Sequence, residues 1–278
     1  MSKNKKTETS NSEEQEFSSR VLGFNWYPGH IAKAEKQLRE KISLIDMVIE
    51  LVDARIPESS AHKELHLWAK DKPVLKIFSK SDIADKSKIL SGIKVNSKNR
   101  NNIDKVIKEI EKQAKPINDR YKLKGLINRP FKVMIVGYPN VGKSSLINAL
   151  AKKKKVQVAN KPGVTRQQQW IDINSNINIK LLDTPGIIPT KFDNDDQALK
   201  LALCSCVSDK SFDSVELARL ALDLIDSLYP GMLQEFYELD SLSLEALAEK
   251  KTNSKLEKAA EILINDFRAQ RFAKISLE

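Results

Sequence analysis

Short apolar runs alternate with helical patterns along the first two thirds of the chain. The strand-like runs lie at residues 46–54, 72–80, 131–139, 168–173 and 179–186, and helical spacing appears at 30–45, 101–115 and 143–153. Alternating strands and helices are typical of a mostly parallel sheet with helices on both faces. We therefore predict an α/β domain, whose ligands should bind at the carboxyl ends of its strands.

The strand pattern ends near residue 195. Beyond it, helical spacing of apolar residues continues at 196–207, 214–229, 243–250 and 255–272. Residues 1–20 are polar, mix both charges and have no periodic apolar pattern. We expect a disordered tail over 1–20, the α/β domain over 21–195 and a small all-α domain over 196–278.

Composition and charge narrow the class of protein. The 278 residues are 41% hydrophobic and 30% charged, and no apolar run approaches the length of a membrane helix. A formal net charge of +10 favours a polyanionic partner such as nucleic acid, or serves solubility alone. Cys204 and Cys206 are poorly spaced for a disulfide or zinc site, so we expect two buried thiols in a reducing compartment, the cytoplasm. Because the chain lacks a long apolar run, we expect no membrane partner.

The stretch GYPNVGKSS, residues 137–145, matches the phosphate-binding pattern G-x-x-x-x-G-K-[ST]. It follows a predicted strand and opens a predicted helix, which is the context that the motif requires. Backbone N–H groups of such a loop surround phosphate oxygens, and the helix N-terminus adds partial positive charge. Lys143 is expected at the β- and γ-phosphates and Ser144 at Mg²⁺. The residues expected at the nucleotide here are Asn140, Val141, Gly142, Lys143, Ser144 and Ser145.

Two later segments fit a site that senses the third phosphate. Asp183 begins D-x-x-G at the end of a predicted strand, where its carboxylate can hold Mg²⁺ through water and the Gly186 N–H can bond the γ-phosphate. D-x-x-G alone is often only a turn, but it lies about 40 residues after the phosphate loop. Thr165, in NKPGVTRQ between the two motifs, is a candidate Mg²⁺ ligand through its hydroxyl.

The stretch SKSD, residues 79–82, resembles the guanine-reading motif N-K-x-D with serine in place of asparagine. Asp82 is expected to accept hydrogen bonds from guanine N1–H and the 2-amino group. Adenine lacks both donors, so a buried unpaired carboxylate would reject it. Lys80 is expected along the face of the base. Ser79 is shorter than asparagine, so we expect the loss of a contact to the base or of the tether to the phosphate loop.

A looser match, VNSKN at residues 95–99, would supply backbone contact to the guanine carbonyl around Ser97 and Lys98. The guanine motif thus precedes the phosphate loop, which reverses the usual order. Because domain termini often lie close together, joining them and opening the chain elsewhere keeps the site intact. We therefore predict a circularly permuted GTPase domain that binds GTP or GDP. The segment after Asp183–Gly186 runs directly into the helical domain, so nucleotide state is expected to reposition that domain.

With these motifs in this order, the chain resembles the ribosome biogenesis GTPase A (YlqF) family of circularly permuted GTPases. The resemblance lies in NWYPGHIAKAEKQL, VDARIP, GYPNVGKSSLINAL, KPGVT, DTPGI and the closing DFRAQRFAKISLE. It implies a bacterial or organellar GTPase that assists late assembly of the large ribosomal subunit. It also implies a monomer off the ribosome, with a helical domain that touches ribosomal RNA, and the +10 net charge agrees with such a partner.

Hydrolysis needs a positioned water, and Ile187 stands where many GTPases have a glutamine for this purpose. The resemblance implies that His30, in WYPGH, acts in catalysis, although a histidine after Pro-Gly is often structural. Asn140 would bind K⁺ beside the phosphates, as in similar GTPases, or would only cap the loop. We expect slow turnover alone and stimulation by a ribosomal partner.

Two other functions remain open at this point. Ser79 and Ile187 would also suit a GTP-binding RNA scaffold that barely hydrolyses, and Ser79 leaves room for an ATP-dependent enzyme. The basic run in AKKKKVQ, residues 151–157, touches RNA or is a solvated helix end. His62 and His66 have helical metal spacing, but no third ligand stands out.

Overall fold

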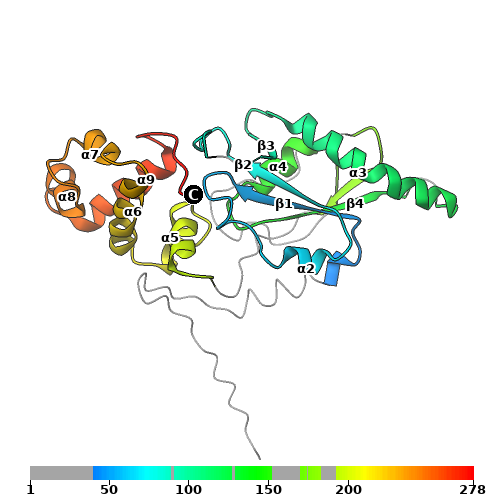
Figure 1. The fold of residues 1–278 in the computed structure, drawn as a ribbon, viewed down its shortest axis with the longest axis horizontal. Helices are drawn as coiled ribbons and strands as arrows, with labels where there is room; N and C mark the ends of the chain where they lie inside the picture. The colour runs from blue at the N-terminus through cyan, green and yellow to red at the C-terminus, as the bar shows by residue number, and fades with distance from the viewer. Residues whose placement is uncertain (1–39, 89–90, 127–128, 152–169, 174, 183–191) are drawn as a thin grey trace, which may run out of the picture.

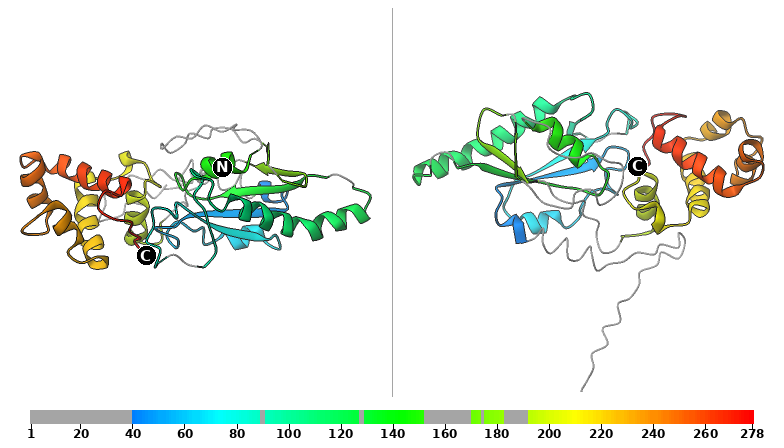
Figure 2. Two further views of the ribbon diagram at one scale, coloured as in Figure 1. Left: turned by 90° about the horizontal axis from the view of Figure 1, so that it is seen from above. Right: turned by 180° about the vertical axis from the view of Figure 1, so that it is seen from behind.

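The computed structural model describes residues 40–88, 91–126, 129–151, 170–173, 175–182 and 192–278. A sheet with its helices forms one end of the molecule, and a helical part, residues 195–278, forms the other (Figure 1). Two further views show the same two parts beside each other along the long axis (Figure 2). No helix among the described residues is long and apolar enough to span a membrane.

Within the described ranges, six strands form one sheet in the order β3-β2-β1-β4-β6-β5. All neighbours are parallel except β5 and β6, which are antiparallel at one edge. The mostly parallel sheet is therefore confirmed. The sequence pattern did not predict β3, whose two residues are too few to show a period. The strands are β1 Met47–Asp53, β2 Val74–Ser79, β3 Ile93–Lys94, β4 Phe131–Val136, β5 Trp170–Asp172 and β6 Ile179–Leu182.

The register of β1 with its neighbours sets the position of the site. Asp53, the last residue of β1, pairs with Ser79, the last residue of β2. On its other side β1 pairs with β4, which leads into the phosphate loop. Because parallel strands end at the same edge, the guanine motif and the phosphate loop emerge side by side although they are far apart in sequence.

Helices cover both faces of the sheet, as predicted. On one face, Ile49 and Leu51 of β1 belong to the core that holds α3, Ile103–Leu123, and α4, Lys143–Leu150. On the other face, Val48 of β1 packs with α2, Leu65–Ala69. Alternate residues of β1 thus enter different cores, which explains why the strand is apolar at every position except Glu50 and Asp53.

Helix α3 is longer than the sequence pattern indicates. The expected helix ended at residue 115, ahead of Pro116, but α3 continues through this proline to Leu123. Proline lacks an N–H and leaves the carbonyl four residues earlier without its helical donor. Pro116 and Lys112 both lie on the exposed side, where water can satisfy that carbonyl.

The helical part packs onto the same core as α3 and α4. Polar side chains begin several of its helices: Asn194 caps α5, Asp213 caps α6 and Ser243 caps α8 by accepting bonds from backbone N–H groups. The short helix α7 was not predicted, and the division into domains at residues 20 and 195 stays a prediction. The helices are α5 Asp195–Leu203, α6 Ser214–Leu228, α7 Met232–Tyr237, α8 Leu244–Thr252 and α9 Leu256–Ala269, with a 3-10 turn at Asp209–Ser211.

After α9 the chain returns to the sheet. Ile275 and Leu277 are buried, and the Leu277 N–H donates to the Arg55 carbonyl at 2.8 Å. The side-chain carboxylate of Glu278 accepts from the backbone N–H groups of Glu58 and Ser59 at 2.6 and 2.9 Å. Residues 275–278 therefore join the helical part to the loop that follows β1.

Candidate nucleotide site

The phosphate loop fits tightly between β1 and α4. A Cβ atom added at Gly137 would lie 2.5 Å from the Leu51 carbonyl oxygen, so only glycine fits there. Gly142 has a φ of 104° and forms the N-cap of α4, a conformation that side chains rarely adopt. Both motif glycines are thus needed for the turn that aims backbone N–H groups at an anion.

Lys143, Ser144 and Ser145 form the first turn of α4, so their backbone N–H groups point out of the helix N-terminus. The Lys143 Nζ is buried and donates to the carbonyls of Gly137 and Tyr138 at 2.9 and 2.7 Å. This buried ammonium lies inside the curve of the loop. The arrangement suits a polyphosphate, with Ser144 placed to offer its hydroxyl to a phosphate-bound Mg²⁺.

Ser79 ties the guanine motif to the phosphate loop. Its hydroxyl lies 2.5 Å from the Val141 carbonyl oxygen and 2.9 Å from that of Val52, and its one proton serves one of them at a time. The loss expected from replacing asparagine therefore does not fall on the tether. Serine keeps this contact because the two loops approach closely: a Cβ on Gly142 would lie 3.8 Å from the Ser79 Cβ.

A buried cluster of charged side chains holds Lys80 of the guanine motif in place. The Asp53 carboxylate is fully buried and accepts from Arg55 Nε and Nη2 at 3.0 and 2.8 Å and from Lys80 Nζ at 2.8 Å. Burial would raise the pKa of Asp53, but the charges and hydrogen bonds of Arg55 and Lys80 hold it well below its usual range. Asp53 thereby fixes the end of Lys80, the residue expected along the base.

The segment after β3 lies beside the guanine motif. Ser81 N and Oγ donate to the Val95 carbonyl at 3.5 and 3.2 Å. Asn96 is buried, and its Oδ1 accepts from the Lys98 N–H at 2.9 Å, which shapes the turn carrying Ser97. The structure therefore brings 95–98 next to 79–82, and Asp82 lies half-buried in the turn between them.

The two histidines in SAHKELHLW make separate contacts. The His62 ring stacks on Tyr138 of the phosphate loop with 4.9 Å between ring centroids, and the backbone N–H of His62 donates to Glu50 Oε1 at 2.8 Å. Burial raises the pKa of Tyr138. The exposed His66 has its Nδ1 2.8 Å from the Lys63 carbonyl oxygen. His62 thus packs beneath the phosphate loop, and no metal cluster of three or more candidate side chains occurs in the described segments.

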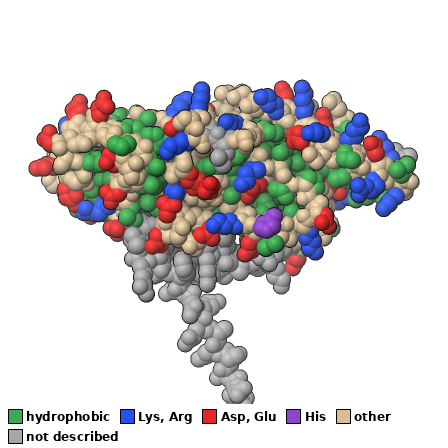
Figure 3. Space-filling model, viewed as in Figure 1, with side chains coloured by type: hydrophobic (Ala, Val, Ile, Leu, Met, Phe, Trp, Pro, Cys, Tyr) green, Lys and Arg blue, Asp and Glu red, His purple; other side chains and the backbone are tan. Residues whose placement is uncertain are grey.

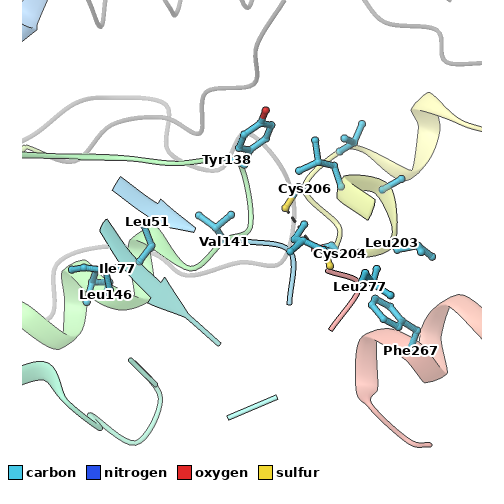
Figure 4. Close-up of a cluster of buried hydrophobic side chains, with 14 of the residues drawn as sticks. Leu51, Ile77, Tyr138, Val141, Leu146, Leu203, Cys204, Cys206, Phe267 and Leu277 are labelled. Atoms are coloured by element: carbon cyan, nitrogen blue, oxygen red, sulfur yellow. Dashed lines mark hydrogen bonds between the residues drawn. The ribbon is translucent and has the colours of Figure 1, made fainter. Parts of the chain in front are cut away.

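The phosphate loop also touches the helical part directly. Asn140, with a φ of 58°, donates from Nδ2 to the Ser205 carbonyl at 2.8 Å, just after α5. Cys204 and Cys206 lie between the phosphate loop and α9 (Figure 4). Both thiols are buried and free, and burial raises the pKa of Cys206 to about 11.

Four of the predicted site residues, His30, Thr165, Asp183 and Gly186, lie outside the described residues, as does Ile187. The structure gathers the other predicted residues at the carboxyl edge of β1, β2, β3 and β4. Sequence reasoning assigned no role to Asp53, Arg55, Tyr138 or Ser205. Only the first two carried a signal, because two opposite charges follow an apolar strand in VDARIP.

Comparison with known proteins agrees with this arrangement. A family model described as 50S ribosome-binding GTPase matches residues 132–265. Ribosome biogenesis GTPase A of Bacillus licheniformis is 34% identical over 91% of this chain and 97% of its own length. Probable ribosome biogenesis GTPase A of Mycoplasma pneumoniae is 31% identical over 94% of this chain and 98% of its own.

A solved structure shares the fold. GNP-bound YlqF from T. maritima superposes with a TM-score of 0.62, at 22% identity, over 88% of this chain and 97% of that chain. The reversed order of guanine motif and phosphate loop, the mostly parallel sheet and the full-length relatives therefore point to one conclusion. The chain belongs to the ribosome biogenesis GTPase A family of circularly permuted GTPases.

Proposed function

We propose that this protein hydrolyses GTP while it assists a late step in assembly of the large ribosomal subunit. The observation that carries the nucleotide part is the contact between Ser79 Oγ and the Val141 carbonyl, which joins a guanine motif to a phosphate loop. The names of its relatives support the ribosomal part. We place the protein in the bacterial cytoplasm as a monomer when it is off the ribosome.

The chemistry follows from the roles proposed for each side chain. Mg²⁺ would neutralise phosphate charge while held by Ser144, Thr165 and, through water, Asp183. Asn140 would offer its Oδ1 to K⁺, with its Nδ2 held by the Ser205 carbonyl at 2.8 Å. His30 would orient the attacking water, because Ile187 has no hydrogen-bonding group.

Base selectivity rests on Asp82, which would accept from guanine N1–H and the 2-amino group. Lys80, held by Asp53 at 2.8 Å, would lie along the base, and the backbone of Ser97 and Lys98 would meet the guanine carbonyl. Gly186 N–H would bond the γ-phosphate. These roles make GTP a better ligand than ATP, in spite of serine at position 79.

The helical part would touch ribosomal RNA around the turn between α8 and α9. A hollow there is lined mostly by amide, hydroxyl and ammonium groups, including Asn253, Thr252 and Lys251, with Glu261 as its one carboxylate and Ile262 as its apolar member. Lys255 and Lys258 also line this hollow. These groups suit phosphate and ribose oxygens.

Two contacts would transmit a change of bound nucleotide to the helical part. Asn140 touches Ser205 from within the phosphate loop. Asp85, which follows the guanine motif, accepts from the Tyr229 hydroxyl at 3.1 Å, while its N–H donates to Ser276 Oγ at 3.1 Å. A shift of either loop on nucleotide exchange would therefore move α5 or the end of α6.

The test is GTP turnover in potassium and in sodium buffer, with and without purified large ribosomal subunits. We expect slow turnover alone, strong stimulation by the subunits and faster turnover in potassium. His30→Ala should lower the stimulated rate, whereas His66→Ala, a matched change of an exposed histidine outside the site, should not. Equal turnover with and without subunits would contradict the ribosomal part of the proposal.

The same assay separates the two other functions. Absence of turnover under every condition, with GTP binding retained, would favour a GTP-binding RNA scaffold. Hydrolysis of ATP at the rate of GTP would favour an ATP-dependent enzyme.

A further inference from the structure

Lysines follow one another along the exposed side of α3. Lys105, Lys108, Lys112, Lys115 and Lys122 are all exposed. Together with Asp119, which takes the fifth of six places, they recur at alternating steps of three and four residues. This spacing places them in one row on the helix, here called the α3 lysine row. The buried residues Val106, Ile110 and Ala114 lie on the opposite side of the helix.

The row extends beyond the body of the protein. The 21 residues of α3 span about 32 Å, and the C-terminal half of the helix projects past the sheet (Figure 1). Ile117 is the last residue of α3 that packs on the core, and Leu123 is 90% exposed. Lysines near the end of α3 are therefore accessible from several sides.

The projecting end is nevertheless held at its base. The Arg129 guanidinium lies 4.0 Å from the centroid of the Tyr121 ring and donates to both Asp46 carboxylate oxygens at 2.8 and 3.0 Å. Asp46 also accepts from the Lys132 N–H at the start of β4, at 2.8 Å. This chain of contacts ties the last turns of α3 to the sheet, so the lysine row has a fixed direction.

The charge of the molecule is divided unequally. Residues 196–278 carry ten Lys and Arg against fifteen Asp and Glu, a formal charge of −5, whereas residues 1–195 carry thirty-seven against twenty-two, a formal charge of +15. Figure 3 shows Lys and Arg gathered over the α3 side and Asp and Glu around the helical end. The excess positive charge therefore lies in the part that contains α3.

Acidic side chains near the α3 lysine row do not neutralise its positive charge. Glu109 lies 3.7 Å from Lys112 and Asp119 3.8 Å from Lys122, at distances typical of weak surface pairs. Glu111 is a helical neighbour of Lys108 and Lys115, but its carboxylate accepts from the Asn176 N–H at 2.8 Å. Asp104 is exposed at the start of the helix, where a carboxylate complements the helix dipole.

We infer that the α3 lysine row binds the phosphate backbone of RNA, as a second contact beside the one proposed at the α8–α9 turn. This inference rests on the proposed ribosomal function. Lysines that step along one helix by about 5 Å of rise suit a line of phosphates and carry no base specificity. Because each lysine replaces a condensed counterion, the contact should weaken steeply with salt.

The experiment compares three variants of the full chain, each of which loses three charges. The first is Lys108→Gln with Lys112→Gln and Lys115→Gln in the α3 row. The second is Lys251→Gln with Lys255→Gln and Lys258→Gln at the α8–α9 turn. The third is a control on other exposed surface, Lys63→Gln with Lys70→Gln and Lys86→Gln. A Lys→Arg version of the first variant keeps its charge.

Binding to protein-free 23S ribosomal RNA and to purified large subunits is measured from 50 to 200 mM KCl. For the α3 variant we expect affinity for both partners to fall on the order of 100-fold at 0.1 M salt, and the slope of log K against log salt to decrease by about two. The control and the Lys→Arg variant should behave as wild type. GTP affinity should be unchanged in all variants, which confirms that they fold.

Each departure has a definite meaning. An α3 variant that binds naked RNA like wild type but loses the subunits would overturn the inference in favour of an acidic ribosomal protein. Unchanged binding to both partners would show that the row is only a solvated surface. If the wild-type protein binds protein-free RNA through α3 but does not bind the subunits, the proposed ribosomal function is refuted, whereas the inference about the α3 lysine row stands.

Discussion

The Ser79 hydroxyl lies 2.5 Å from the carbonyl oxygen of Val141, although the two residues are 62 positions apart in the chain. Ser79 ends the strand that leads into the guanine motif, and Val141 lies within the phosphate loop. One short side chain therefore connects the two halves of a site whose order in the sequence is reversed.

Ser79→Ala should weaken GTP binding about tenfold, because the loss of one buried hydrogen bond is worth about 1–2 kcal/mol and frees the two loops from each other. Ser175→Ala is the matched control: Ser175 is half-buried, and its hydroxyl donates to the Ile177 carbonyl at 2.7 Å without reaching either loop of the site. It should lower stability alone. Equilibrium titration with GTP measures both variants, and unchanged affinity in Ser79→Ala would refute the tether.

Asp53→Asn should lower the free energy of unfolding by about 3 kcal/mol, because it leaves Arg55 and Lys80 without their shared buried counter-charge. Glu238→Gln removes the exposed partner of Lys250 and should cost less than about 0.5 kcal/mol. Denaturant unfolding of both variants gives the comparison. Equal losses in the two variants would mean that the Asp53 cluster contributes no more than a surface pair.

The same cluster predicts a pH dependence. The pKa of Asp53 is lower in the folded protein than in the unfolded chain, so the carboxylate stabilises the fold fully at pH values above its ordinary pKa. This contribution is lost as the pH falls below about 4 towards the folded pKa. The difference in unfolding free energy between wild type and Asp53→Asn should therefore shrink in acid. A difference that stays constant from pH 7 to 3 would rule out the lowered pKa.

Leu277→Ala should destabilise the protein by about 2–4 kcal/mol, because Leu277 is buried where residues 275–278 meet the loop after β1. Leu123→Ala, which changes a 90% exposed leucine at the end of α3, should shift stability by less than about 0.5 kcal/mol. Thermal unfolding of the two variants is the measurement. If Leu277→Ala unfolds at the same temperature as wild type, the packing of residues 275–278 against the loop after β1 does not contribute to stability.

Long apolar strands could be predicted from sequence because burial on both faces favours apolar residues at most positions, as in β1, where Glu50 and Asp53 are the exceptions. Helices α6 and α9 were visible for a related reason, since their apolar residues recur on one side. The two residues of β3 are too few to show any period. The continuation of α3 past Pro116 depends on the exposure of Lys112 and Pro116, which no local pattern reveals.

The candidate site was predictable as far as local motifs describe it. GYPNVGKSS and SKSD identify their own loops, because each chemistry requires particular residues at fixed spacing. The partners of Ser79, Asp53 and Asn140 are set by strand register and by packing of the helical part. Such long-range contacts cannot be predicted from the local sequence. For this reason the serine in SKSD was expected to lose a contact to the base or to the phosphate loop.

The most direct test of the permuted site is competition for a fluorescent guanine nucleotide by GTP and ATP, in wild type and in Asp82→Ala. Asp71→Ala, which changes an exposed aspartate outside the site, is the control. We predict that GTP displaces the probe from wild type and from the control far better than ATP does, and that Asp82→Ala loses this preference because the carboxylate that reads guanine is gone. Equal displacement by ATP in wild type, or an intact preference for GTP in Asp82→Ala, would contradict the assignment of residues 79–82 as the guanine reader.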